Sequence, residues 1–117
     1  MSQIARFQET LRRLVIFDEG FVDAGFGLGR AGASALDAKT AALLQVAVSV
    51  AIGSSAVCLQ WGTARALAAG ATKDEIADVL LAIVPVAGLG RVVSAAPGVA
   101  AALEYDIDAA LEEPDNY

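Results

Sequence analysis

The chain contains no histidine and only one cysteine among its 117 residues. A single cysteine cannot form an internal disulfide, and without histidine the commonest metal ligand and the usual general base at neutral pH are both missing. Zinc fingers, Ser-His-Asp triads and Cys-His nucleophile pairs are therefore excluded. We expect neither a metal nor a cofactor. Aromatic residues make up only 6% of the chain but hydrophobic residues 56%, a composition that excludes a disordered protein.

Basic residues are too few to form a surface for nucleic acid. Residues 1–103 carry as many acidic as basic residues and are neutral overall. The net charge of −6 arises in the acidic tail 104–117, whose carboxylates are Glu104, Asp106, Asp108, Glu112, Glu113 and Asp115. Such a tail repels a phosphate backbone. We expect no nucleic-acid partner.

A long uncharged stretch lies between Lys39 and Arg65, and its length alone would allow it to span a bilayer. Polar residues and a Gly-Ser turn interrupt it: Gln45, Ser49, Gly53, Ser54, Ser55 and Gln60. The two resulting helices are too short to cross comfortably, so we expect no membrane insertion. The first residues lack the pattern of a secretory signal, and with a lone thiol this favours a cytoplasmic protein.

The length predicts a single all-α domain over residues 1–117. A helix is expected over residues 3–17, because apolar residues recur there at helical spacing (Ile4, Phe7, Leu11, Leu14 and Val15). Residues 25–36 are rich in Gly and Ala and indicate a connection. They include a G-x-G-x-x-G string at 27–32, but no strand precedes it, which argues against a dinucleotide site. No segment alternates with the period of a strand.

Further helices are delimited by capping residues. Asp37 suits the N-cap of a helix over 38–52, and Ser54 or Ser55 can cap a third helix to Ala69, with Gly70 just beyond its end. Thr72 and Glu75 form the sharpest local pattern, a capping box at the start of a fourth helix. Pro85 is expected to end or kink that helix. A helix near 91–96, another from Pro97 to Leu103 and a last turn from Asp106 to Leu111 complete the prediction.

Two segments of the core, 36–44 and 66–76, resemble the carboxymuconolactone decarboxylase and alkylhydroperoxidase-D superfamily. The strongest match is Ala66-Leu67-Ala-Ala-Gly70-Ala71-Thr72-Lys-Asp-Glu75-Ile76, which follows a broken helix pair. The similarity extends over roughly residues 36–96. It implies a compact all-α subunit that assembles into trimers or hexamers. It also implies that the site lies near the second helix of the pair.

The chain departs from that family at its reactive positions. Redox members carry C-x-x-C-x-x-x-H, whereas here Ser55, Cys58 and Gly62 stand at the three positions. The early acidic residue of the preceding helix has no counterpart among Ala41, Ala42 and Leu43, and the decarboxylase stretch Y-x-G-x-P is replaced at residues 86–90. Because disulfide cycling needs two thiols, dithiol peroxidase activity is not expected.

The candidate site residues are those that remain near the second helix of the pair. Cys58 is a candidate nucleophile, although its apolar neighbours favour a place in the core. Trp61 could wall a pocket or serve an interface, and Arg65, one turn later, could reach the same face or make a surface salt bridge. Arg91 follows Gly88-Leu89-Gly90 and is the candidate anion holder, or an interface ion pair. Gln60 and Ser55 complete the candidate ligand-binding set.

These residues lead to three hypotheses of different classes. The first is a protein that binds or converts a small hydrophobic or carboxylated molecule by non-redox chemistry, resembling a decarboxylase or lyase if it is an enzyme. The second is a non-catalytic ligand-binding or assembly protein that keeps only the family fold. The third is a single-cysteine peroxidase using Cys58. Helices that are apolar on several faces favour a homo-oligomer, for which the resemblance implies a trimer or hexamer.

Overall fold

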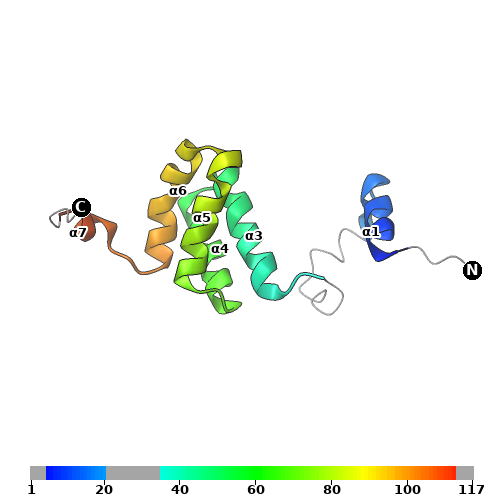
Figure 1. Ribbon diagram of the computed structural model, residues 1–117, viewed down its shortest axis with the longest axis horizontal. Coiled ribbons are helices and arrows are strands. Elements are labelled where there is room, and N and C mark those ends of the chain that lie inside the picture. Colours follow the sequence, from blue (N-terminus) through cyan, green and yellow to red (C-terminus); the bar gives the residue numbers. More distant parts are fainter. Residues whose placement is uncertain (1–4, 21–34, 113–117) are drawn as a thin grey trace, which may run out of the picture. The chain divides into compact units, whose positions relative to one another are not determined.

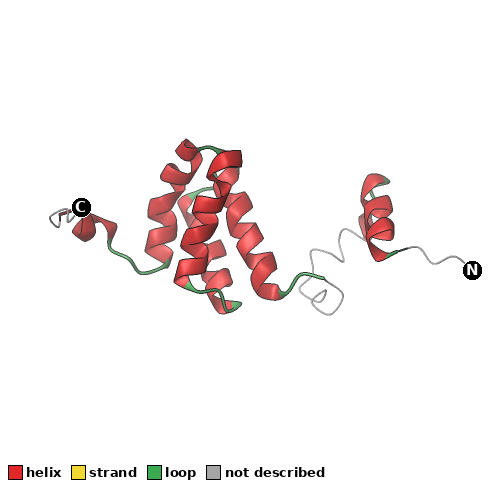
Figure 2. Ribbon diagram, viewed as in Figure 1, coloured by secondary structure: helices red, strands yellow, loops and turns green. Residues whose placement is uncertain are grey.

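The computed structural model describes residues 5–20 and 35–112 and shows two compact units, residues 1–35 and 36–117. Every regular element in the described residues is a helix, which confirms the all-α prediction for that part of the chain (Figures 1 and 2). The predicted connection 25–36 and its glycine string lie almost wholly outside the described residues. The prediction of one domain over the whole chain stays a prediction.

The first unit contains helix α1 (Arg6–Val15). Its polar side is held together by Glu9, which accepts hydrogen bonds from Arg12 Nη2 at 2.9 Å and from Arg13 Nε at 2.8 Å. These two arginines lower the pKa of Glu9 to about 2. The apolar stripe predicted from the sequence is present, but the helix buries none of its residues: Phe7 remains 65% and Leu11 56% exposed.

The second unit is a bundle of α3 (Ala38–Ala51), α4 (Ala56–Ala68), α5 (Lys73–Ala87) and α6 (Leu89–Ala102), followed by the short α7 (Ile107–Glu112) (Figure 1). Its core is made of aliphatic side chains from the four long helices and from the turn before α5: Ala42, Val46, Val50, Leu59, Ala66, Ala71, Ile76, Leu80, Val92, Ala95 and Val99. Gly98 is buried on α6 where this helix packs on α4, and its Cβ position lies at van der Waals distance from Leu59.

The predicted caps are confirmed at atomic level. Asp37 Oδ1 accepts a hydrogen bond from the Thr40 N–H at 2.7 Å, and the Ser55 hydroxyl accepts one from the Cys58 N–H at 3.3 Å. At the capping box, the Thr72 hydroxyl accepts from the Glu75 N–H at 3.0 Å while the Glu75 carboxylate accepts from the Thr72 N–H at 2.9 Å. Asp106 likewise caps α7. Side chains thus satisfy backbone groups that a helix start leaves unpaired.

Pro97 does not act as predicted, whereas Pro85 lies two residues before the end of its helix. Helix α5 continues past Pro85 to Ala87, and α6 runs unbroken from Leu89 to Ala102 with Pro97 inside it. The expected boundary at Pro97 is therefore wrong. A proline removes one backbone hydrogen bond, but residues on both sides of Pro97, including Val92 and Val99, are buried in the same core. Their packing keeps the helix continuous.

The length and apolar character of the helices bear on the question of membrane insertion. Within residues 5–20 and 35–112, no helix combines the length and the apolar character needed to cross a bilayer.

Candidate functional site

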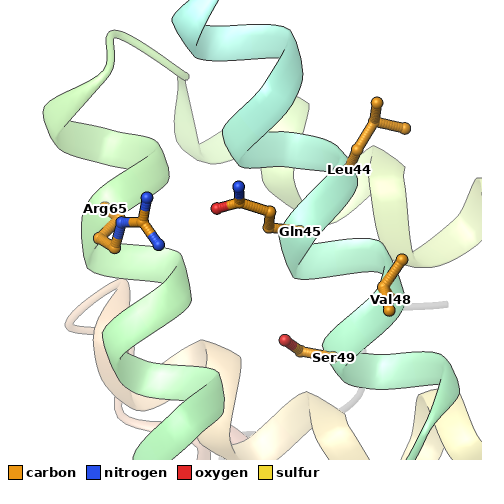
Figure 3. Close-up of a pocket in the computed structure, with 5 residues that line it drawn as sticks. All are labelled: Leu44, Gln45, Val48, Ser49 and Arg65. Atoms are coloured by element: carbon orange, nitrogen blue, oxygen red, sulfur yellow. The ribbon is translucent and has the colours of Figure 1, made fainter. Parts of the chain in front are cut away.

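A groove opens between α3 and α4 on the surface of the bundle. It has a volume of about 390 Å³ and is lined by Leu44, Gln45, Val48, Ser49 and Arg65. Figure 3 shows the Arg65 guanidinium and the Gln45 amide pointing toward each other from the two helices. Ser49 lies one turn further along α3, with its hydroxyl on the same side as the Gln45 amide (Figure 3). The volume is in the range of small-molecule sites, which start at roughly 300 Å³.

The spacing of buried residues explains why these side chains face the groove. Val46 and Val50 anchor one face of α3 in the core, and Thr63 and Ala66 anchor α4. Thr63 is completely buried, but its hydroxyl donates to the Leu59 carbonyl oxygen at 2.7 Å and so needs no other partner. With those faces turned inward, the residues adjacent in sequence, Gln45, Ser49 and Arg65, emerge where the two helices meet the surface.

The polar side chains of the groove are available to a ligand. Among the described residues, no hydrogen bond or ion pair involves the side chains of Gln45, Ser49 or Arg65. Together they offer a fixed positive charge, an amide and a hydroxyl. A guanidinium with neighbouring neutral donors is suited to a carboxylate, because charge-assisted hydrogen bonds are stronger than neutral ones.

Arg65 is oriented by the only tryptophan of the chain. Its Cζ lies 4.9 Å from the centre of the Trp61 ring, a distance at which a cation is attracted to the face of an indole. Trp61 is 65% exposed, and Leu44 and Val48 are more than half exposed on the α3 side. The apolar lining of the groove, Leu44 and Val48, comes from α3, and the Trp61 indole lies beside the lining residue Arg65 without itself being part of the lining.

The other predicted site residues do not line this groove. Arg91 lies against the turn between α3 and α4, where a Cβ on Gly53 would collide with its guanidinium. The hydroxyl of Ser55 caps α4, and Gln60 is exposed elsewhere on that helix. Of the residues expected to converge, only Trp61 and Arg65 are brought together.

Cys58 is exposed, so the interpretation of this residue as part of the core is wrong for the single chain. Cys58 lies in the first turn of α4. The buried positions of this helix begin one residue later, at Leu59, and recur one turn further on, at Thr63. The thiol consequently lies on the outer side of the helix, and it is not among the residues that line the groove.

Sequence reasoning missed Gln45 and Ser49 as site residues. In the sequence both stand out only as polar interruptions of an apolar stretch. Their spacing of four residues, in the uncharged part of α3 that follows Lys39, places both on one face of the helix, and this was the available signal. Which neighbouring helix carries the matching cation depends on how α3 and α4 pack.

The groove has no group that exchanges protons near neutral pH. Its lining contains no Asp, Glu or Cys. A long-range ion pair joins Lys39 Nζ to Glu75 Oε2 at 3.0 Å, between the starts of α3 and α5. The Thr72 backbone N–H and Lys39 together lower the pKa of Glu75. Within the described part of the chain, acidic and sulfur side chains form no group that could hold a metal ion.

The fold and this groove define an all-α bundle with an open cationic cleft between its first two bundle helices. The sequence model of the carboxymuconolactone decarboxylase family matches residues 17–102. The chain therefore belongs to that family. The resemblance recognised in the sequence is thereby confirmed. Neither the curated proteins nor the solved structures gave a significant match.

Proposed function

We propose that the protein binds a small organic acid with an apolar body in the groove between α3 and α4. The observation that carries this proposal is the meeting of Arg65, Gln45 and Ser49 at one cleft, where none of the three forms a hydrogen bond or ion pair with another described side chain. The carboxylate would pair with the guanidinium and take hydrogen bonds from the amide and the hydroxyl. The apolar part of the ligand would lie along Leu44, Val48 and the indole of Trp61.

Binding is favoured over conversion because the lining residues supply no general acid or base. Proton transfer needs a group whose pKa lies near the working pH, and amide, hydroxyl and guanidinium groups do not meet this condition. A decarboxylase or lyase activity would need a proton-transfer group from outside the groove. The non-catalytic member of the three hypotheses is therefore the one that the groove supports best.

Benzoate is a suitable probe, and Trp61 supplies a built-in reporter because it is the only tryptophan. Titration is followed by Trp fluorescence and, independently, by calorimetry, since changes at Arg65 also alter the indole environment. We expect saturable binding of benzoate and much weaker binding of benzamide, its uncharged counterpart. Arg65→Gln should weaken benzoate binding by about tenfold or more, the worth of a charge-assisted hydrogen bond.

Arg91→Gln is the matched control, because it removes the same charge from an exposed arginine outside the groove. It should leave benzoate binding unchanged. Absence of any saturable heat with the unmodified protein, or equal losses for the two arginine variants, would contradict the proposal.

The single-cysteine peroxidase is the competing chemistry, and the exposure of Cys58 gives it an accessible thiol. It predicts that the protein consumes peroxide in the presence of a thiol reductant and that Cys58→Ser abolishes this turnover. Turnover that is absent, or unchanged in the variant, would reject this alternative. Since Cys58 does not line the groove, the same variant should bind benzoate normally.

We also propose that the protein forms a homo-oligomer, with a trimer or a hexamer expected from the family resemblance. Large apolar side chains are exposed on α1 and on each of the four long bundle helices, among them Leu11, Leu44, Trp61, Leu81 and Val93. Extensive exposed apolar surface marks protein interfaces. Light scattering over a range of concentrations measures the assembly, and a chain that stays monomeric throughout would refute it.

A further inference from the structure

Arg65 carries the charge of the groove, but no polar partner among the described residues fixes it. Its guanidinium forms no hydrogen bond or ion pair with a described residue. A long arginine side chain has many rotamers, and a ligand that binds it must offset the entropy that is lost when the side chain becomes ordered. The affinity of the groove for an anion therefore depends on whether Arg65 is held in place before the ligand arrives.

Trp61 is the residue that restrains Arg65. The two side chains are four residues apart on α4 and so lie on the same face of that helix. The Arg65 Cζ lies 4.9 Å from the centre of the indole ring, and the negative face of an aromatic ring attracts a cation at this distance. Leu59 and Thr63, two residues before and two residues after Trp61, are buried and anchor the helix at this point. A fixed helix thus presents the ring to the guanidinium.

The indole and a ligand use different parts of the same guanidinium. This group is planar, so its face stacks on an aromatic ring while its N–H groups donate from the edge, within the plane. The Arg65 guanidinium lies over the Trp61 ring and points across the groove toward Gln45 (Figure 3). Trp61 can therefore restrain Arg65 without competing for the hydrogen bonds that a carboxylate would accept.

We propose that Trp61 is a positioning residue of this groove. It holds the Arg65 guanidinium where this group binds the carboxylate of the ligand, and it thereby makes the groove selective for acids over their uncharged counterparts. Trp61 is not among the lining residues, so this effect passes through Arg65. The inference rests on the proposed binding of an organic acid and assigns the residue on which the charge selectivity of that binding depends.

Direct contact between the indole and the ligand is the alternative explanation for an effect of Trp61 on binding. The charge of the ligand separates the two explanations. A positioning residue acts on the carboxylate through Arg65, so its loss weakens the binding of a charged ligand and spares an uncharged one. A residue that offers only apolar contact affects both ligands alike, because the hydrophobic effect depends on the apolar area that is buried.

The test compares two substitutions of Trp61 in the full-length protein. Trp61→Phe keeps an aromatic face for Arg65, whereas Trp61→Leu keeps an apolar side chain without an aromatic face. Calorimetric titration measures the affinity of each variant for benzoate and for benzamide. We expect Trp61→Leu to weaken benzoate binding about threefold to fivefold, as for a cation–π contact at an exposed site, and Trp61→Phe to retain most of the affinity. Benzamide binding should change in neither variant.

Two further variants serve as controls. Gln60→Leu places the same new side chain at the neighbouring exposed position of α4, outside the groove, and should leave benzoate binding unchanged. In a protein that already carries Arg65→Gln, the substitution Trp61→Leu should cause no further loss of benzoate affinity, because the cation that Trp61 positions is gone. Far-UV circular dichroism checks that all variants keep their helix content.

An NMR measurement without ligand tests the restraint itself. The ring current of the indole should shift the side-chain proton resonances of Arg65 upfield, and this shift should disappear in Trp61→Leu. Arg65 resonances at ordinary positions in the unmodified protein would overturn the inference, whatever the groove binds.

The outcomes separate this inference from the proposed function. If the unmodified protein does not bind benzoate, both are overturned. If benzoate binds and Trp61→Leu leaves its affinity unchanged, the inference alone is overturned. Equal losses for benzoate and benzamide also overturn it, since Trp61 would then be a contact residue. So do equal losses of benzoate affinity in Trp61→Phe and Trp61→Leu, because an aromatic face would then not be what holds Arg65.

Discussion

Helices α1 and α3 show opposite relations between sequence pattern and burial. In α1 the apolar residues form a clear stripe, yet Phe7 is largely exposed and the helix buries nothing. In α3 apolar residues occur on several faces, yet Val46 and Val50 are at most 1% exposed. Periodicity shows which face a helix would bury, but whether that face is covered depends on the neighbours. In the bundle α4, α5 and α6 provide that cover, whereas α1 lies in a separate unit.

The largest expected effect is the difference in stability lost when a large apolar side chain is truncated in the bundle and in α1. Ile76→Ala should destabilise the bundle by about 2–5 kcal/mol, because Ile76 is fully buried and the truncation leaves a cavity. Phe7→Ala removes a larger side chain from α1 but should change the same free energy of unfolding by less than about 0.5 kcal/mol. Urea unfolding measures both, at a protein concentration low enough for single chains to predominate. Similar losses in the two variants would break the comparison.

A smaller difference concerns the helix starts. At α5 both halves of the capping box are present, whereas at α1 only the Gln8 side chain accepts from the Ala5 N–H, at 3.0 Å, since Ala5 has no hydroxyl. Thr72→Ala should therefore cost the bundle about 1 kcal/mol. Ala5→Thr should complete the box at α1 and increase its helix content. Urea unfolding and far-UV circular dichroism test the two changes, and a Thr72→Ala variant of unaltered stability would contradict the first.

Two glycines of the bundle should respond oppositely to the same substitution. Gly53 has a φ of +73° and no space for a Cβ beside Arg91, so Gly53→Ala should cost roughly 1 kcal/mol through backbone strain. Gly62 lies inside α4 with nothing within 4 Å of its Cβ position. Gly62→Ala should therefore stabilise the bundle by up to about 1 kcal/mol, because alanine has the higher helix propensity. Melting temperatures that shift in the same direction in the two variants would refute this contrast.

The smallest effect is the acid response of α1. Because Arg12 and Arg13 lower the pKa of Glu9 to about 2, the ionised carboxylate stabilises the helical form. This contribution is complete above the ordinary value of 4.5 and is lost as the pH falls toward 2. An NMR titration of the Glu9 side chain should give the lowered pKa, and Glu9→Gln should remove this part of the acid dependence. A Glu9 pKa near 4.5 would show that the pairs with Arg12 and Arg13 do not persist in solution.

Much of the fold follows from local sequence. The stripe of α1 and the caps at Asp37, Ser55, Thr72 and Asp106 were all predictable, because each depends on residues within one or two turns of each other. The family resemblance likewise rests on a continuous segment. The boundary expected at Pro97 was wrong because the local cost of a proline says nothing of the packing of Val92 and Val99 on either side of it.

The candidate site was only partly predictable. The sequence indicated Trp61 and Arg65, which lie one turn apart on one helix, and their contact needs no information from elsewhere. Gln45 and Ser49 are distant from them in the chain and join the site only through the antiparallel packing of α3 and α4. The position of Arg91 at a helix start predicted that it holds an anion. In the structure its guanidinium lies against the turn at Gly53 instead of in the groove.

The sequence by itself therefore determined the helical class, the helix starts that carry a side-chain cap, and the absence of paired thiols and histidine, since these depend on composition and on short-range hydrogen bonds. Only the tertiary structure decided which apolar faces are covered and which polar side chains meet. Burial and convergence depend on contacts between residues far apart in the chain, and no local pattern specifies them. A clear apolar stripe such as that of α1 therefore does not by itself establish burial.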